Sequence, residues 1–396
     1  MKFIDLGLDQ RILDGIDAMG YETATPVQQQ VMVPILEGKD IIAAAQTGTG
    51  KTAAFLLPLL HRLLTSPHHA GDINALVIVP TRELAIQIAE GLEGLAYFTD
   101  VSSIAVYGGG DGNSFAAEKK ALTSGADIVV CTPGRLIAHL NMGYVKLKGL
   151  KYLVLDEADR MLDMGFSEDI AKITTYLPKE RQNLLFSATM PAKMRDLAKK
   201  ILKDPIEINI AISKPPEQIT QKAFVLYEAQ KVPVIKDMLS SKRFTKVIVF
   251  CSKKQNVKVL TAELKRAKLA VEEIHSDLDQ KSREQYLQDF RNQKTNILVA
   301  TDILSRGIDI DDIDLVINYD VPNDGEDYIH RIGRTARAAT SGTAFTLVGE
   351  KEQSKFATIE ELLGAPVTKG TIPVAFGPTP AYAPKIRSNK GFNHRR

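Results

Sequence analysis

The chain has 396 residues, of which 44% are hydrophobic and 25% are charged, and we expect two domains because a single core rarely organises so long a chain. No apolar run approaches the ~18 residues of a membrane-spanning helix, and the N-terminus is too acidic for a signal peptide, so a cytoplasmic protein is expected. Cys131 and Cys251 lie in separate apolar runs and are expected to be buried thiols without a disulfide.

The net charge of +2 is unevenly distributed. Residues 377–396 carry five basic residues and no acid, so the remainder has a net charge of 2 − 5 = −3. Any affinity of this remainder for nucleic acid must therefore come from the local placement of basic residues. We expect residues 372–396 to form a flexible basic tail, because they contain too few apolar residues for a core.

Short apolar runs alternate with longer amphipathic patterns, which predicts an α/β protein with parallel sheets covered by helices on both faces. We expect strands within residues 40–45, 75–80, 103–108, 127–133, 152–157, 183–189, 246–252, 271–276, 296–302, 315–320 and 343–349. The clearest helical patterns lie within residues 81–98, 253–269 and 351–364. Pro215 and Pro216 predict a linker over residues 211–218, between domains at 1–210 and 219–371.

The stretch "AAAQTGTGKT" (residues 43–52) predicts a phosphate-binding loop between a strand and a helix. Gly48 and Gly50 permit a tight turn with inward N–H groups, Lys51 adds a cation, and Thr52 offers a hydroxyl to Mg²⁺. The glycine that usually begins this motif is replaced by Ala45. A glycine-rich turn with an accidental G-K-T is the alternative.

Acidic residues follow the apolar strand expected at residues 152–155: Asp156 and Glu157, and then Asp159. Carboxylates at the carboxyl end of a parallel strand lie where such sheets bind ligands. Asp156 is suited to hold Mg²⁺, and Glu157 is suited to orient or deprotonate a water. The alternative is that these acids only favour the start of the next helix.

Three arginines at three-residue spacing follow His330 in "HRIGRTAR": Arg331, Arg334 and Arg337. Guanidinium groups keep their charge, and like charges on one helix face repel. The spacing therefore predicts that an anion binds there.

The residues Asp156 to Asp159 spell D-E-A-D, and the phosphate loop has the form A-x-x-G-x-G-K-T. On these motifs the chain resembles the DEAD-box ATP-dependent RNA helicases of superfamily 2, and in particular bacterial members with short tails, from Phe3 to about residue 370. The resemblance implies two RecA-like domains with ATP and RNA bound across the cleft between them. It also implies ATP and Mg²⁺ as cofactors, and RNA-dependent ATPase and helicase activity.

The resemblance implies that "GYETATPVQ" (residues 20–28) reads adenine, with Gln28 bonding the base edge, Tyr21 supplying an aromatic face and Phe3 supporting it. The implied nucleotide-binding residues are Tyr21, Gln28, Gln46, Thr47, Gly48, Thr49, Gly50, Lys51, Thr52 and Asp309. The implied catalytic residues are Lys51, Asp156, Glu157, Arg334 and Arg337. The implied metal ligands are Thr52 and Asp156.

The resemblance further implies contacts to the RNA sugar-phosphate backbone, since none of the residues concerned is aromatic. These residues are Pro80, Thr81, Arg82, Gly109, Thr132, Gly134, Arg135, Arg283, Thr301 and Arg306. Coupling between the domains is assigned to Asp159, Ser187, Thr189 and His330. Arg331 is expected to pair with an acid and so help to hold His330.

Three functions remain open at this point. The first is a helicase that melts short RNA duplexes or remodels RNA–protein complexes. The second is an ATP-gated RNA clamp or assembly factor, and the third is a DNA-translocating ATPase. The expected partners are RNA and ribosomal or RNA-decay proteins, with the chain acting as a monomer away from membranes.

Overall fold

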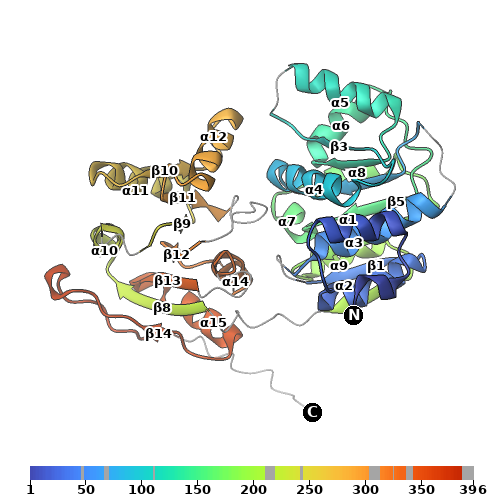
Figure 1. The fold of residues 1–396 in the computed structure, drawn as a ribbon. Helices are drawn as coiled ribbons and strands as arrows, with labels where there is room; N and C mark the ends of the chain where they lie inside the picture. Colours follow the sequence, from blue (N-terminus) through green and yellow to red (C-terminus); the bar gives the residue numbers. More distant parts are fainter. Residues whose placement is uncertain are drawn as a thin grey trace, which may run out of the picture. The chain divides into compact units, whose positions relative to one another are not determined.

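The computed structural model describes residues 1–45, 49–66, 71–109, 112–209, 219–240, 244–302, 313–323, 325–335 and 342–385 (Figure 1). The chain divides into two compact units, Met1–Ser213 and Lys214–Arg396. The linker expected at residues 211–218 lies outside the described residues. Every helix within the described ranges is too short or too polar to cross a membrane.

The first unit contains a seven-stranded parallel sheet of order β3-β4-β2-β5-β6-β1-β7. Its strands are β1 (Ile41–Ala44), β2 (Ala75–Ile78), β3 (Ser103–Val106), β4 (Ile128–Cys131), β5 (Tyr152–Leu155), β6 (Gln182–Ser187) and β7 (Ile206–Asn209). Most of these strands are buried on both faces, which explains their continuous apolar sequences.

Helices cover both faces of this sheet. They are η1 (Phe3–Leu6), α1 (Gln10–Ala18), α2 (Pro26–Leu36), α3 (Lys51–Thr65), α4 (Arg82–Leu95), α5 (Gly112–Ser124), α6 (Pro133–Asn141), α7 (Ala158–Asp163), α8 (Ser167–Thr174) and α9 (Ala192–Ile201). Ile41 and Ala43 pack with α1 to α4, whereas Ile42 packs with α6 to α9, because alternate strand residues face opposite sides.

The second unit repeats this architecture with a parallel sheet of order β10-β11-β9-β12-β13-β8-β14. Its strands are β8 (Ile219–Leu226), β9 (Val247–Cys251), β10 (Val271–Ile274), β11 (Ile297–Thr301), β12 (Leu315–Asn318), β13 (Gly342–Gly349) and β14 (Thr368–Lys369). Two covered parallel sheets confirm the predicted fold class.

The helices of the second unit also lie on both faces of the sheet. They are α10 (Glu228–Ser240), α11 (Lys254–Arg266), α12 (Gln280–Arg291), α14 (Gly325–Ile332), η2 (Glu350–Glu352), α15 (Gln353–Leu363) and η3 (Val374–Phe376). The helices α10 and α11 pack on one face, and α12, α14 and α15 pack on the other. Cys131 and Cys251 are free and buried, one in each unit, as expected.

Residues 372–385, whose composition predicted a flexible tail, are instead folded onto the second unit. The side-chain amide of Gln353 donates to the carbonyl oxygen of Ala381 at 2.9 Å and accepts from the N–H of Ala383 at 2.7 Å. The ring of Tyr382 packs against the hydrophobic residues of α14 and α15 on one face of the sheet. Polar side chains therefore hold a segment that has few apolar residues of its own. The rest of the tail lies outside the described residues.

Candidate nucleotide and RNA sites

The candidate nucleotide site of the first unit lies at the carboxyl end of its sheet. The last residue of β1, Ala44, is paired with Ser187 of β6, and β5 ends at Leu155 on the far side of β6. All strands run in the same direction, so the segments that follow them converge at one edge. Lys51 and Asp156 come from two of these segments.

Lys51 begins α3, and its ammonium group is buried. Gly50 precedes it with φ +88°, and a Cβ at Gly50 would lie 2.6 Å from Nε2 of Gln28, so glycine is required there. Only 6% of Lys51 is exposed, and its Nζ has no hydrogen-bond partner among the described residues. A buried ammonium at a helix N-terminus is suited to bind an anion.

The other expected residues of the phosphate loop fall on both sides of a gap in the described chain. Thr49 lies directly before Gly50, and Thr52 is the second residue of α3 and is half-buried. Gln46, Thr47 and Gly48 lie outside the described residues.

Gln28 connects the start of α2 to the phosphate loop. Its Nε2 donates to the carbonyl oxygen of Gly50 at 3.1 Å, and its Oε1 accepts from the N–H of Thr25 at 2.8 Å. A primary amide has two donors and two acceptor lone pairs. One donor and one acceptor are therefore left for an adenine edge.

The two aromatic residues expected near adenine differ in exposure. Tyr21 is 41% exposed and can offer a ring face to a base. Phe3 is buried in the core beside α1 and α2, so its ring is part of the packing. Its expected supporting role stays a prediction.

Asp156 and Glu157 are buried between β5 and α7. Burial raises the pKa of Asp156 to about 6; the charge of Lys51 opposes this shift and the charge of Glu157 adds to it. Glu157 has φ +49° and ψ +48°, which is unusual for a residue other than glycine. Its Oε2 is buried without a hydrogen-bond partner among the described residues. The strained backbone thus holds a free carboxylate oxygen next to Asp156.

This donor set fits a magnesium nucleotide better than a metal bound by protein alone. Within the described residues there is no group of three or more His, Cys, Asp or Glu side chains that could hold a metal ion. Mg²⁺ commonly binds through one or two protein oxygens and the phosphates of its substrate. The Asp156 carboxylate and the Thr52 hydroxyl can supply those oxygens, and the Lys51 ammonium can bind the phosphates.

Asp159 joins this site to the strand that ends at Ser187. Its Oδ2 accepts from the N–H of Thr189 at 3.1 Å, while the Ser187 hydroxyl donates to the carbonyl oxygen of Thr189 at 2.6 Å. All three residues come from the set assigned to coupling. Asp159 is therefore hydrogen-bonded directly to the segment that follows β6.

Two of the RNA-binding residues expected in the first unit, Arg82 and Gly109, lie together. A Cβ at Gly109 would lie 2.0 Å from Nη1 of Arg82, and the φ of Gly109 is +94°. Pro80 precedes Thr81, whose hydroxyl caps α4 by accepting from the N–H of Leu84 at 3.3 Å. Thr81 thus has a structural role as well.

Arg135 lies in the first turn of α6, after Thr132 and Gly134. Its Nε donates to Oε2 of Glu118 at 2.7 Å, and its guanidinium lies 4.5 Å from the centre of the Phe115 ring. Its Nη2 is buried without a hydrogen-bond partner among the described residues. The side chain of Thr132 does not cap the helix. Guanidinium and hydroxyl groups are donors of the kind that bind phosphate oxygens, so the expected role of Arg135 and Thr132 stays a prediction.

In the second unit Arg331 forms the ion pair that was expected of it. Its Nε and Nη2 donate to Oδ1 and Oδ2 of Asp302 at 2.6 and 2.7 Å, and its Nη1 donates to the carbonyl oxygen of Asp320 at 2.9 Å. Arg331 is fully buried, and its neighbours His330 and Arg334 are also buried. Arg331 therefore anchors α14.

The remaining expected residues of the second unit are only partly described. The Oγ1 of Thr301 is buried without a hydrogen-bond partner among the described residues. Arg283 donates from Nη2 to the carbonyl oxygen of His275 at 3.5 Å. Arg306, Asp309 and Arg337 lie outside the described residues.

Two protein families match the chain. The DEAD/DEAH box helicase domain matches residues 25–197, and the helicase conserved C-terminal domain matches residues 230–339. The ATP-dependent RNA helicase CshA of Listeria monocytogenes is 42% identical over 361 residues, which cover 91% of this chain and 68% of that protein. The chain belongs to the DEAD-box family of RNA helicases. It is accordingly an RNA-dependent ATPase of the helicase class.

Other relatives of this helicase support the same family assignment. The DEAD-box ATP-dependent RNA helicase RhpA of Helicobacter pylori is 40% identical, over 94% of this chain and 74% of that protein. A structure described as S. cerevisiae Dbp5 bound to RNA and ADP BeF3 is 31% identical and has a TM-score of 0.84, over 93% of this chain and 95% of that one. The tandem RecA-like fold of the helicase is thereby confirmed.

Two site residues were missed from sequence. Glu118 holds Arg135, and Asp302 holds Arg331. Asp302 directly follows β11, so the strand-end argument applied to Asp156 would also have found it. Nothing in the sequence around Glu118 distinguishes it from the other acids on helix surfaces.

Proposed function

We propose that this helicase uses ATP hydrolysis to melt short RNA duplexes locally or to remodel RNA–protein complexes. The observation that carries the proposal is the corner of Lys51, Asp156 and Glu157. There a buried ammonium and a buried carboxylate oxygen, neither with a hydrogen-bond partner among the described residues, lie near one aspartate. Such groups suit the charge of a magnesium nucleotide and the water that attacks it.

Each residue of this corner has a proposed role. Lys51 binds the phosphates, Thr52 and Asp156 hold Mg²⁺, and Glu157 orients the attacking water. Bound Mg²⁺ neutralises charge that develops on the phosphates. We also propose that Arg334 and Arg337 contribute to hydrolysis as arginine fingers. Such residues are worth roughly 10³ to 10⁵ in rate.

The proposed RNA contacts are to the backbone. Arg82, Arg135 and Arg283 offer guanidinium groups, and Thr132 and Thr301 offer hydroxyls. The Oγ1 of Thr301 has no hydrogen-bond partner among the described residues and can bond a ribose 2′-hydroxyl, which would favour RNA over DNA. Asp159, Ser187, Thr189 and His330 are proposed to couple the nucleotide state to RNA binding.

The alternative is an ATP-gated RNA clamp, which needs the same residues. A strand-displacement assay on a short RNA duplex distinguishes the two, with an all-DNA duplex and the Lys51→Ala variant as controls. We expect displacement that requires ATP, RNA and Lys51. ATPase activity stimulated by RNA without displacement of any strand would favour the clamp.

We further propose that the helicase acts as a monomer in the cytoplasm. The support for this location is the activity of its bacterial relatives on RNA. Ribosomal or RNA-decay proteins are the partners that such an activity suggests. Size-exclusion chromatography with light scattering tests the monomer, and crosslinking in the source cell tests the location and the partners.

A further inference from the structure

The two sheets have the same strand order. Position by position, β8, β12 and β13 of the second unit match β1, β5 and β6 of the first. The helix after β1 is α3, which begins with Lys51, and the helix after β8 is α10. The second unit therefore has a corner that is topologically equivalent to the nucleotide corner.

Both corners contain a lysine and an aspartate. In the first unit Lys51 begins α3, and its charge acts on Asp156, which directly follows β5. In the second unit Lys231 lies in the first turn of α10, and Asp320 lies just after β12. The Nζ of Lys231 is 3.9 Å from Oδ1 of Asp320. The lysine–aspartate pairing is thus repeated.

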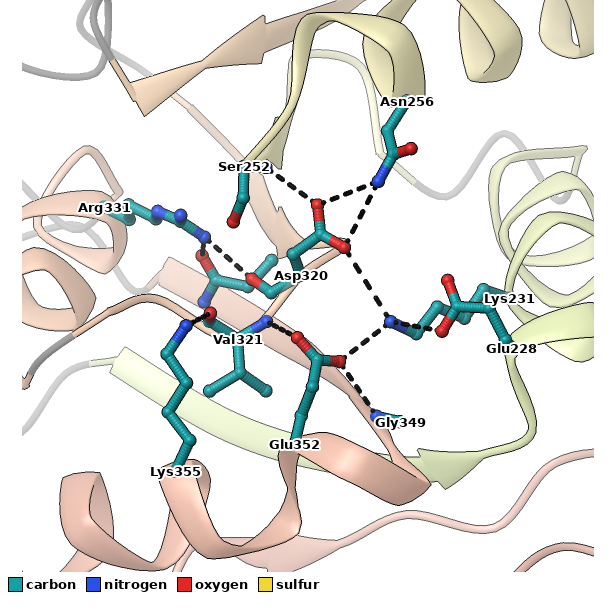
Figure 2. Close-up of polar contacts among 11 residues, drawn as sticks. Glu228, Lys231, Ser252, Asn256, Asp320, Val321, Arg331, Gly349, Glu352 and Lys355 are labelled. Atoms are coloured by element: carbon teal, nitrogen blue, oxygen red, sulfur yellow. Dashed lines mark hydrogen bonds and ion pairs between the residues drawn. The ribbon is translucent and has the colours of Figure 1, made fainter.

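The two lysines differ in their remaining partners. The Nζ of Lys231 lies 2.9 Å from Oε2 of Glu352 and 3.1 Å from Oε2 of Glu228, as Figure 2 shows. Both lysines are buried, but the Nζ of Lys51 has no hydrogen-bond partner among the described residues. The second corner is therefore neutralised from within the chain.

Glu352 is bound in the way that a phosphate loop binds an anion. Besides the ammonium, its Oε1 accepts from the N–H of Val321 at 2.9 Å, and its Oε2 accepts from the N–H of Gly349 at 3.1 Å. A Cβ at Gly349 would lie 3.0 Å from Oε2 of Glu352 and 3.5 Å from Nζ of Lys231. Backbone N–H groups, a lysine and a closely approaching glycine are the elements that hold phosphate at such a corner.

We propose that the Lys231 corner is an anion site that is permanently occupied by the carboxylate of Glu352. The occupied site fixes the turn at residues 319–321, because Glu352 bonds the N–H of Val321 and Asp320 accepts from the N–H of Ser252 at 2.7 Å. The carbonyl oxygen of Asp320 accepts from Nη1 of Arg331 (Figure 2). Lys231 and Glu352 are thus positioning residues for Arg331 and α14.

The anion site is tested in the full chain by removing its internal ligand. Glu352→Ala leaves room for a small carboxylate, so the probe is sodium formate, compared with sodium chloride at the same ionic strength. Cys251 labelling reports unfolding of the second unit and Cys131 labelling that of the first, because burial raises the pKa of both thiols and keeps them unreactive while folded.

We expect Cys251 of Glu352→Ala to be labelled faster than in the wild type, and formate to slow this labelling in a saturable manner. Wild type and Lys231→Met/Glu352→Ala should show no such response, since one has no free site and the other has no ammonium. An equal effect of formate on all three proteins, or none on Glu352→Ala, would overturn the anion site.

If Glu352→Ala does not fold, Glu352→Gln and Lys231→Met/Glu352→Gln provide the test. An amide facing Lys231 leaves the buried ammonium without its main counter-charge, and methionine removes that ammonium. The double variant should therefore unfold at a higher urea concentration than Glu352→Gln. An equal or lower urea midpoint for the double variant would show that Glu352 does not serve as the anion of Lys231.

The positioning role rests on the proposed function and has its own readout. For Glu352→Ala we expect RNA-stimulated kcat to fall several-fold with an unchanged KM for ATP, and formate to restore kcat along with stability. An unchanged kcat would remove the positioning role and leave the anion site standing. Lack of RNA-stimulated turnover in the wild type would instead count against the proposed function, and the labelling experiment would be unaffected.

Discussion

The side-chain amide of Gln28 donates to the carbonyl oxygen of Gly50, 22 residues later in the chain. The residue expected to read adenine is therefore bonded to the backbone of the phosphate loop. Its other amide atom accepts from Thr25, at the start of α2. One side chain thus connects the proposed base-reading position to the backbone of the proposed phosphate loop.

Gln28→Glu tests this connection. A carboxylate can still accept from Thr25, but it cannot donate to the carbonyl oxygen of Gly50, and the two oxygens repel. We expect a loss of about 1–3 kcal/mol in unfolding free energy, measured by denaturant titration without nucleotide. We also expect weaker ATP binding and less discrimination against GTP. Unchanged discrimination would separate Gln28 from base recognition.

Glu157→Gln tests the role of the buried carboxylate. The substitution preserves side-chain size but removes the negative charge that is proposed to orient or deprotonate water. ATP and RNA binding should remain within a few-fold of wild type, while RNA-stimulated turnover falls by about 10²-fold or more. Near-normal turnover in single-turnover kinetics would falsify this role.

Asp156→Asn should stabilise the nucleotide-free protein at neutral pH. The folded-state pKa of Asp156, about 6, lies above its ordinary value of 3.8, mainly because the carboxylate is buried. The folded chain then binds more protons than the unfolded chain between these pH values, so stability falls as pH rises from about 4 to 6. The loss amounts to at most about 3 kcal/mol above pH 6.

The measurement is denaturant unfolding across this pH range in EDTA. Asp156→Asn should lack the decline between pH 4 and 6, and Glu168→Gln, at an exposed acid of α8, should retain it. The same Asp156→Asn protein should lose ATPase activity. Identical pH profiles for Asp156→Asn and the wild type would show that another group titrates.

Arg331→Met should destabilise the second unit by about 3 kcal/mol, because it leaves Asp302 without its bidentate partner. Lys254→Met is the matched control: it breaks an ion pair with Asp277 whose side chains are 56% and 38% exposed, and should cost at most about 0.5 kcal/mol. Urea titrations of both variants compare the two. Similar losses would mean that burial of the Arg331 pair adds nothing.

The amino-acid sequence was sufficient to predict most strands of the two sheets. Each of the eleven expected strands overlaps an observed strand, and most of these strands are continuous apolar runs because they are buried on both faces. Three strands were missed. β7 exposes three of its four residues, β8 begins with the polar residues of "ITQK", and β14 has only two residues. Strands at a sheet edge or with mixed burial lack the continuous apolar run by which the other strands were predicted.

The candidate site was predictable where local sequence determines it. Strand ends and a glycine-rich turn were enough to locate Lys51 and Asp156. The same argument also locates Asp302, but it does not pair that acid with Arg331, 29 residues later, and it does not find Glu118, 17 residues before Arg135. Which acid reaches which arginine depends on how α5 and β11 pack, and residue spacing does not carry that information.

The folded segment 372–385 also limits how far the last basic residues can extend. The carbonyl oxygen of Lys385 accepts from the hydroxyl of Ser354, at the start of α15. Eleven residues follow, from 386 to 396, and a fully extended chain spans at most about 3.6 Å per residue. The four basic residues among them therefore lie within about 40 Å of that attachment point. Any RNA that they bind must also lie within that distance.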